Sequence, residues 1–261
     1  MSLVFAAIVP HSPLLVPNIG KKNQDLFPAT LEACKTIASQ LQTSQPDVVM
    51  IISNDETKPI HTFAINVSPK FNSDLSAFGD LVTRWQFKGE LQLAAQFREK
   101  LESEETIKLI SNDELHYTAS ISLSLAGVTE TTPILPLITT NSNLKSHFIL
   151  GHHLQKCILD SEKKIAVIIS ADLSHRLSKK SPIGYLAKAK KLDQKIITSL
   201  ISGKTKELLS LPASTLEEAA VEDLGQIAVL LGIVKDFDWP ARLLSYESPF
   251  GVGHAVIGYN F

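Results

Sequence analysis

The segment at residues 165–175, which reads IAVIISADLSH, is the stretch that best indicates the fold. Its first part, residues 165–169, is an unbroken apolar run. Such runs are typical of strands that are buried on both faces of a sheet. The run passes directly into a polar stretch that ends in Asp172, Ser174 and His175. We therefore expect a buried strand that delivers chemically active side chains at its carboxyl end.

Two other segments also consist of an apolar run followed directly by polar residues. The apolar run at residues 3–9 continues into Pro10, His11 and Ser12, and the run at residues 48–52 continues into Ser53, Asn54 and Asp55. Weaker strand patterns lie at residues 134–138, 243–246 and 255–259, the last two joined by a turn at residues 249–251. Because proline lacks the N–H that a ladder needs, Pro136 favours an edge strand or a bulge at residues 134–138.

Apolar residues at helical spacing fill the regions between these strands. They indicate amphipathic helices around residues 31–41, with a start near Pro28, and around residues 94–101, 186–192 and 224–231. Strands that alternate with such helices predict an α/β fold, with a central, mostly parallel or mixed sheet sandwiched between helices. We find no low-complexity linker and no repeat, so we expect one domain over residues 1–261.

Composition and charge narrow the class of protein. The chain is 44% hydrophobic and 20% charged, with a net charge of −2, which argues against disorder and against a dedicated nucleic-acid binder. Cys34 and Cys157 predict free buried thiols in a reducing cytosol. The apolar opening at residues 3–10 is far shorter than the roughly 20 residues of a membrane span, and no basic stretch precedes it. We expect a soluble, cytoplasmic protein that binds neither nucleic acid nor membrane.

The polar ends of the three buried strands suggest a shared site. In open α/β sheets, ligands bind at the carboxyl ends of the strands, so parallel neighbours would bring His11, Asp55 and His175 into one crevice. The alternative is that each polar cluster is only a turn with capping residues. Imidazole and carboxylate together suit a metal site or acid–base chemistry. A serine hydrolase fits poorly, because the chain has no G-x-S-x-G motif.

The remaining candidates carry weaker signals. His116 is expected in a loop that enters a helix, where a surface or capping role is the commoner one. His61 favours a structural role, and His254 fits either a strand or a pocket wall. Residues 176–195 hold seven basic residues and one acid. A solvated helix face explains that run better than an anion or nucleic-acid patch does, because only Tyr185 interleaves with it.

Three segments together resemble a known family. They are IVPHSPLLVP at residues 8–17, ISADLSHRL at residues 169–177 and YESPFGVG at residues 246–253. In this order and at this spacing they resemble the class III extradiol dioxygenases, whose type member is the catalytic β subunit of protocatechuate 4,5-dioxygenase. The Memo-like branch is the most similar. The resemblance spans nearly the whole chain.

The resemblance implies a single α/β domain with a non-haem Fe(II), held by two histidines and a glutamate. His11 matches the first metal ligand, His175 the acid–base histidine and His116 a pocket histidine. Two positions depart from the pattern. Asp55 stands where the family has its second ligand histidine, and Glu222 lies one residue after the position of the ligand glutamate.

These departures change the expected metal chemistry. If His11, Asp55 and Glu222 hold the metal, the site with Fe(II) is neutral, and a carboxylate-rich site also suits Mn²⁺ or Mg²⁺. One residue along a helix turns a side chain by about 100°, so Glu222 serves only if the backbone there is not regular helix. If Glu222 points away, only His11 and Asp55 remain, which are too few for tight metal binding, and an empty site is then the alternative.

Three functions are consistent with the resemblance and its departures. The first is ring cleavage of a small aromatic diol with O₂ at an altered iron site. The second is a non-catalytic, Memo-like binding or scaffold protein that acts through a protein partner. The third is another metal-dependent enzyme, such as a hydrolase, on the same scaffold. A homo-oligomer and a companion subunit that completes the pocket both remain open.

Overall fold

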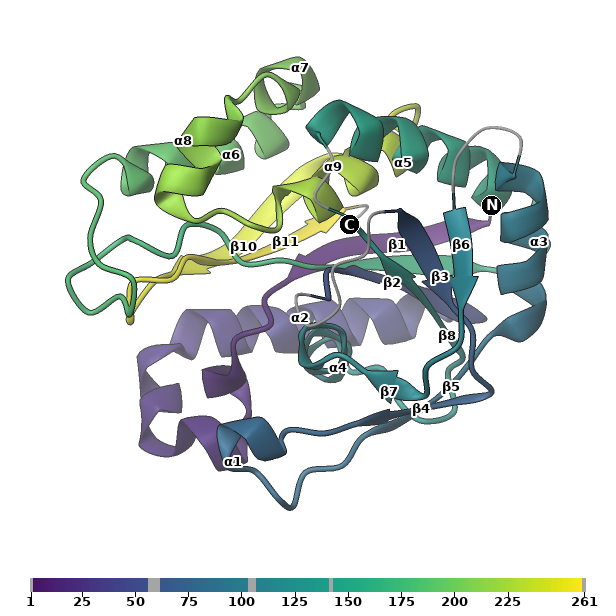
Figure 1. Ribbon diagram of the computed structural model, residues 1–261, viewed down its shortest axis with the longest axis horizontal. Coiled ribbons are helices and arrows are strands. Elements are labelled where there is room, and N and C mark those ends of the chain that lie inside the picture. The colour runs from purple at the N-terminus through teal and green to yellow at the C-terminus, as the bar shows by residue number, and fades with distance from the viewer. Residues whose placement is uncertain (1, 56–61, 103–106, 141–142, 260–261) are drawn as a thin grey trace.

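The computed structural model describes residues 2–55, 62–102, 107–140 and 143–259. An eight-stranded mixed sheet runs through its centre in the order β10-β11-β1-β9-β2-β8-β3-β6 (Figure 1). In that order the strands are Ala241–Glu247, His254–Tyr259, Leu3–Val9, Ile165–Ser170, Val48–Ser53, Ile134–Ile138, Phe63–Asn66 and Ile107–Ile110. The helices α1 to α9 are Pro17–Gly20, Pro28–Ser44, Leu91–Leu101, Tyr117–Leu125, Leu144–Leu159, Ala189–Ile201, Thr205–Leu209, Ala213–Ala219 and Leu224–Ile233.

The four central strands, β1, β9, β2 and β8, are parallel to their neighbours. Ile169 of β9 is in register with Ile8 of β1 and with Ile52 of β2, so these three strands end at the same level. Parallel strands that end at one level direct their carboxyl-terminal loops to the same edge of the sheet. The polar segments after β1, β2 and β9 therefore meet at that edge. The strands β11 and β3 join this parallel centre antiparallel.

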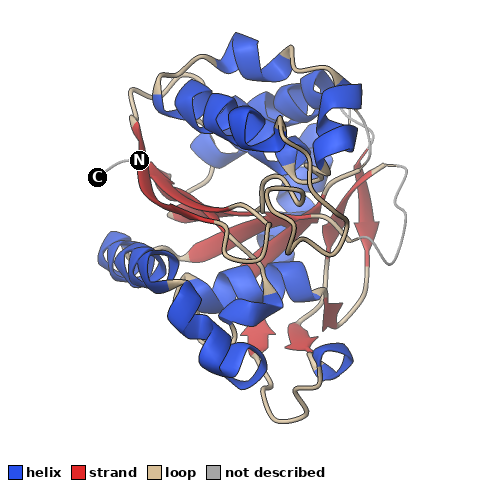
Figure 2. Cartoon of the chain, turned by 90° about the vertical axis from the view of Figure 1, so that its left-hand side faces the viewer, coloured by secondary structure: helices blue, strands red, loops and turns tan. Residues whose placement is uncertain are grey.

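Helices cover both faces of the sheet, as the edge-on view in Figure 2 shows. One face packs on α3, α5, α6 and α9, and the other on α2 and α4. Alternate strand residues serve the two faces: Ile8 belongs to the first core, and Ala7 and Val9 to the second. Burial on both sides is the reason that these strands read as continuous apolar runs. The predicted α/β class with a mixed sheet between helices is confirmed.

The expectation for Pro136 is wrong. Its strand, β8, lies inside the sheet between β2 and β3, and Pro136 is paired with Ile51 of β2. The pairing with β3 is confined to Leu137 and Ile138. Proline is tolerated here because β3 pairs only beyond Pro136, where no N–H is missing from the ladder.

The boundaries of the other predicted elements agree closely with the structure. β1 spans the predicted residues, while β2 and β9 each extend one residue further, to Ser53 and Ser170. The turn after β10 is also present, and Gly251 lies in it with φ +83°. α2 begins at the predicted Pro28, whereas α6 begins only at Ala189.

The segment between β3 and α3 forms a small second sheet together with a strand that follows β6. β4 (Lys70–Ser73) pairs with β5 (Gln86–Lys88) and with β7 (Glu114–Leu115), below α4 in Figure 1. Phe87 and Trp85 anchor it to the second core. Short 3₁₀ helices lie at Pro13–Leu15, Lys21–Leu26 and Ser76–Phe78. Among the described residues, no helix has both the length and the apolar character to cross a membrane.

Candidate functional site

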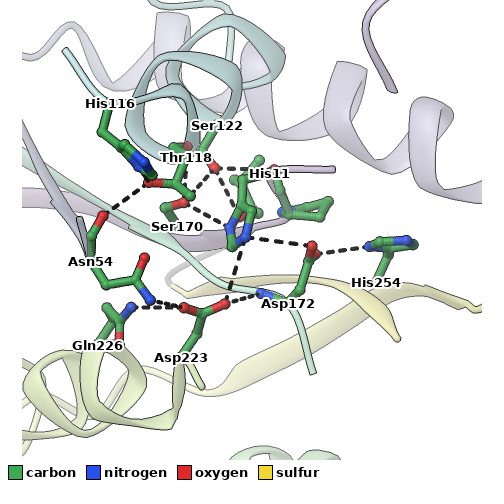
Figure 3. A network of polar contacts seen from close by, with 12 residues as sticks. His11, Asn54, His116, Thr118, Ser122, Ser170, Asp172, Asp223, Gln226 and His254 are labelled. Carbon is green, nitrogen blue, oxygen red and sulfur yellow. Dashed lines mark hydrogen bonds and ion pairs between the residues drawn. The ribbon is translucent and has the colours of Figure 1, made fainter. Parts of the chain in front are cut away.

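His11 lies at the centre of a buried polar cluster at the carboxyl edge of the sheet (Figure 3). Its Nε2 atom is 3.6 Å from Oδ2 of Asp172 and 3.8 Å from Oδ2 of Asp223. Its Nδ1 atom is 3.1 Å from the hydroxyl of Ser170, the last residue of β9. That hydroxyl donates to the carbonyl oxygen of Thr118, so it is oriented to accept from Nδ1. The ring is therefore fixed with Nε2 directed at two carboxylates.

Asp172 is the anionic member of the cluster. Its Oδ1 atom is 2.8 Å from Nδ1 of His254, the first residue of β11. Burial alone would raise the pKa of Asp172, but the positive potential of His254 and His11 outweighs it and holds the pKa well below its usual range. Asp172 therefore joins two histidines that come from opposite ends of the chain.

Asp223 has a different environment, although it is equally buried. Its carboxylate accepts hydrogen bonds from the backbone N–H of Asp172 at 2.9 Å, from Asn54 at 3.0 Å and from Gln226 at 2.9 Å. Burial raises its pKa, and the contact with His11 opposes this rise only in part. The two aspartates beside His11 thus differ in their tendency to hold a proton.

His175, which the sequence singled out, follows Asp172 in the loop after β9. Its backbone N–H donates to Ala219 at 3.0 Å, which fixes this part of the loop after β9. A positive charge on its ring would lower the pKa of Asp172 and of Asp223, so the imidazole is within their electrostatic reach. Its Nε2 atom is buried and has no hydrogen-bond partner among the described residues. Such an atom costs free energy unless a ligand or water satisfies it.

Asp193 of α6 holds the loop that carries Asp172 and His175. Its carboxylate accepts hydrogen bonds from the backbone N–H of Ser174 at 3.1 Å, from the Ser174 hydroxyl, and from the hydroxyl of Tyr246 at 2.6 Å. Gly253 packs so closely on Asp193 that a Cβ atom there would collide with the carboxylate. The loop geometry is therefore set by side chains from α6 and β10.

A second histidine–aspartate pair lies next to this cluster. Nε2 of His116 is 3.8 Å from Oδ1 of Asp55, and its Nδ1 is 2.9 Å from the hydroxyl of Thr118. That hydroxyl donates to the carbonyl oxygen of Asn54 at 3.1 Å. Because Ser170 bonds both Thr118 and His11, polar contacts through Thr118 and Ser170 connect the two histidines (Figure 3).

The predicted site residues therefore fall into three places. His11 and His175 surround the buried aspartates, while Asp55 lies with His116. Glu222 is exposed at the rim of a cleft, and the carboxylate that reaches His11 is that of Asp223. The assignment of His11, Asp55 and Glu222 as metal ligands stays a prediction. His61 lies outside the described residues.

The turn before α9 explains why the neighbour of Glu222 occupies the site. α8 ends at Ala219, and Ala220 adopts a left-handed conformation with φ +49°. Residues 220–223 are therefore not helical, and helical rotation does not describe where their side chains point. Asp223 was missed by sequence reasoning, whereas the sequence allowed either a strand or a pocket wall for His254, which is the first residue of β11 and binds Asp172. The only available signals were the position of Asp223 beside Glu222 and the position of His254 after a glycine turn.

The side chains around His11 do not fit the iron centre that the resemblance implies. Over the described ranges, no group of three or more His, Cys, Asp or Glu side chains is arranged to hold a metal ion. Asp223 is already engaged by three donors, and one oxygen of Asp172 is engaged by His254. The cluster is thus organised as a hydrogen-bonded acid–base network of the protein's own side chains.

Two cavities approach this network and share Asp55 in their walls. The smaller, of about 350 Å³, is lined by His116, Asn66 and Glu114 among others. The larger, of about 1110 Å³, reaches Asn54 and Val221 from the side of α5 and α8. A ligand therefore has room on both sides of the strand end that carries Asp55.

Comparison with known proteins supports the assignment of the fold. The chain is 23% identical to Protein CA_C1420 of Clostridium acetobutylicum, over 98% of this chain and 57% of that protein. It thus spans little more than half the length of that curated relative. The crystal structure of uncharacterized protein JW3007 from Escherichia coli K12 superimposes with a TM-score of 0.67 at 13% identity. That match covers 98% of this chain and 100% of the other, and it shows a shared fold.

The family itself is shown by a match over most of the sequence. Residues 5–257 match the family described as the catalytic LigB subunit of aromatic ring-opening dioxygenase. This match includes His11, Asp172, His175, Asp223 and His254, and it confirms the resemblance carried by the three sequence segments. Because it covers nearly the whole chain, the protein belongs to the family of LigB-type catalytic subunits of aromatic ring-opening dioxygenases.

Proposed function

We propose that the protein binds a small hydroxylated aromatic compound and transfers a proton at His175, without the iron centre that the family resemblance implies. Membership of the family supports an aromatic substrate. The proton transfer follows from the site, because the buried network around His11 consists of imidazoles, carboxylates and hydroxyls. Iron-dependent ring cleavage with O₂ stays a prediction, which the same protein samples can test.

One observation carries the proposal. The Nε2 atom of His175 is buried and lacks a hydrogen-bond partner among the described residues, although carboxylates lie nearby. Leaving a buried polar group unsatisfied costs about 1–3 kcal/mol. A substrate hydroxyl would remove this cost by donating to Nε2. Proton transfer from that hydroxyl would then leave an imidazolium, which the negative charge of Asp172 stabilises.

The neighbouring residues support this role without entering the reaction. Ser174 and Asp193 hold the backbone of the loop that carries His175. His11 is fixed by Ser170 and faces Asp172 and Asp223, the two carboxylates that are within electrostatic reach of His175. A site that is organised before the substrate arrives needs little reorganisation during the reaction.

The proposal is tested with 4-nitrocatechol, whose visible absorption shifts when a hydroxyl loses its proton. The probe is titrated into protein that has been treated with a chelator, in the wild type and in His175→Gln. His152→Gln is the matched control, because His152 also has a buried ring nitrogen with no partner among the described residues but lies in α5. We expect the shift in the wild type and in the control, and its loss in His175→Gln with binding retained.

The same samples separate the iron-dependent alternative. Fe(II) is added without oxygen, the iron content is measured, and oxygen uptake is then followed with catechol. If the absorption shift needs Fe(II) and oxygen uptake follows, the metal-free proposal is refuted and ring cleavage is supported. If the probe shifts equally in wild type and His175→Gln, His175 is not the group that takes the proton.

A binding protein without turnover is the second candidate. The burial of the network favours this candidate. Less than a tenth of the surface is exposed in each of its members, which are His11, Asp172, Asp223 and His254. In that case the protein acts through a partner, and catechols leave the site unchanged. Recovery of chemically unaltered catechol after long incubation, together with unchanged affinity in His175→Gln, would support this candidate.

A further inference from the structure

The larger cavity has a volume and a lining that exceed what the binding of a single aromatic ring requires. It is a cleft of about 1110 Å³ between α5, the α7–α8 segment and the start of α9. Figure 1 shows α7 and α8 on the same side of the sheet as α5 and α9. Ordinary small-molecule pockets measure roughly 300–1,000 Å³. The cleft therefore has room for a ligand considerably longer than a catechol.

One wall of the cleft is apolar. Leu211, Leu216 and Val221 line it from the α7–α9 side and are each 6–9% exposed. Leu144 of α5 lines the cleft as well and is half-buried. These side chains come from two separate parts of the chain, and both sets pack against the main core. They form a surface that gains free energy when another apolar group covers it.

The inner end of the cleft is polar and reaches the candidate site. Asn54 lies there, and its side-chain amide donates to Asp223 in the buried network. Thr139 also lines this end. Charged side chains such as Lys145 and Glu217 lie along the cleft. The lining therefore combines polar groups next to the acid–base network with apolar and charged side chains from the α7–α9 segment.

We propose that this cleft binds the apolar tail of the substrate, so that the natural ligand is a hydroxylated aromatic compound with an alkyl or similarly apolar extension. The hydroxylated head lies toward Asn54 and the tail lies against Leu211, Leu216 and Leu144. The inference about the head group rests on the function proposed above. The inference about the tail rests only on the volume and lining of the cleft.

The test compares the affinities of catechol, 4-butylcatechol and butylbenzene for the full chain, by calorimetry. Each buried methylene contributes enough to strengthen binding about three- to fourfold. Because the cleft is open to solvent, we expect 4-butylcatechol to bind on the order of 10- to 100-fold more tightly than catechol. The variant Leu144→Asn should reduce this ratio several-fold and leave the affinity for catechol unchanged.

The matched control is Leu159→Asn. Leu159 lies at the other end of the same helix, is 50% exposed and does not line the cleft. It should keep the wild-type ratio. A general loss of folding in Leu144→Asn would appear as weaker binding of catechol too. In that case the ratio of the two affinities, for 4-butylcatechol and for catechol, is evaluated in the wild type alone, because that comparison needs no variant.

The outcomes distinguish this inference from the proposed function. Equal affinity for catechol and 4-butylcatechol overturns the tail site and leaves the proposed function standing. Binding of 4-butylcatechol and butylbenzene, with no binding of catechol, supports the tail site and removes the support for the head group. If none of the three compounds binds, both proposals are refuted.

Discussion

The hydrogen bond between Tyr246 and Asp193 offers the most direct test of how the site loop is held. The Tyr246 hydroxyl donates to Oδ2 of Asp193 at 2.6 Å, and the other carboxylate oxygen binds Ser174. Asp193 is fully buried. The variant Tyr246→Phe removes one hydroxyl and leaves the ring, so it deletes this donor and little else.

The expected cost follows from the charge on the acceptor. A hydrogen bond to a charged group contributes about 1.5–3 kcal/mol, whereas one between neutral groups contributes about 1 kcal/mol. We therefore expect Tyr246→Phe to lower the free energy of unfolding by about 2 kcal/mol when Asp193 is ionised. For a chain of this size, that corresponds to a fall in Tm of about 4–8 °C.

The cost should depend on pH in a defined direction. Burial raises the pKa of Asp193, and the bonds from Ser174 and Tyr246 oppose that rise only in part. The folded state thus keeps a proton at pH values where the unfolded chain releases it. The contribution of Asp193 is full below its unfolded pKa and is lost as the pH rises through the raised pKa. Because the ionised carboxylate is the stronger acceptor, Tyr246→Phe should cost more at pH 8 than at pH 4.

Urea denaturation at both pH values measures these differences. Tyr185→Phe is the control, because Tyr185 is 52% exposed, and it should change stability by less than about 0.5 kcal/mol. In an Asp193→Asn background, Tyr246→Phe should cost at least about 1 kcal/mol less than in the wild type, because the charged acceptor is gone. Equal costs in the two backgrounds, or a cost no larger than that of Tyr185→Phe, would refute the reasoning.

Three further predictions concern other charged groups. Asp172→Asn removes the negative charge that faces His254 Nδ1 at 2.8 Å and His11, and it should cost about 1.5–3 kcal/mol in urea denaturation. A loss below about 0.5 kcal/mol would contradict a charge-assisted hydrogen bond at Asp172. Glu247 accepts from the backbone N–H groups of Ala29 and Thr30 at the start of α2, so Glu247→Gln should cost about 1 kcal/mol, and Glu32→Gln, an exposed control, much less. Hydrogen bonds from Thr83 and Val82 lower the pKa of Asp80 to about 2, so the wild type should lose stability as the pH falls from 4 to 2. Asp80→Asn should lose less over that range, and identical losses would show that Asp80 makes no such contribution.

The sheet and part of the site could be predicted from the sequence because they depend on local patterns. Residues 3–9, 48–52 and 165–169 are apolar without interruption, and strands covered on both faces are what this pattern is typical of. Parallel strands that end at one edge then bring His11 and His175 to the same region. These conclusions need no knowledge of how distant segments pack.

The carboxylates around His11 could not be predicted in the same way. Asp223 reaches the site because Ala220 is left-handed and residues 220–223 are not helical, so no period relates Glu222 to its neighbour. His254 meets Asp172 across a separation of 82 residues. No local sequence pattern predicts either contact, because both arise from the packing of segments that are far apart in the chain.

The amino-acid sequence by itself determined the α/β architecture, its buried parallel strands and the family to which the chain belongs. The tertiary structure alone decided which side chains share the site. It paired Asp55 with His116, turned Asp223 toward His11 in place of Glu222, and tolerated Pro136 inside the sheet. The physical reason is that a strand buried on both faces appears in the sequence as an unbroken apolar run, and a helix as apolar residues at helical spacing. The direction of a side chain in an irregular turn is set by the elements that pack against it.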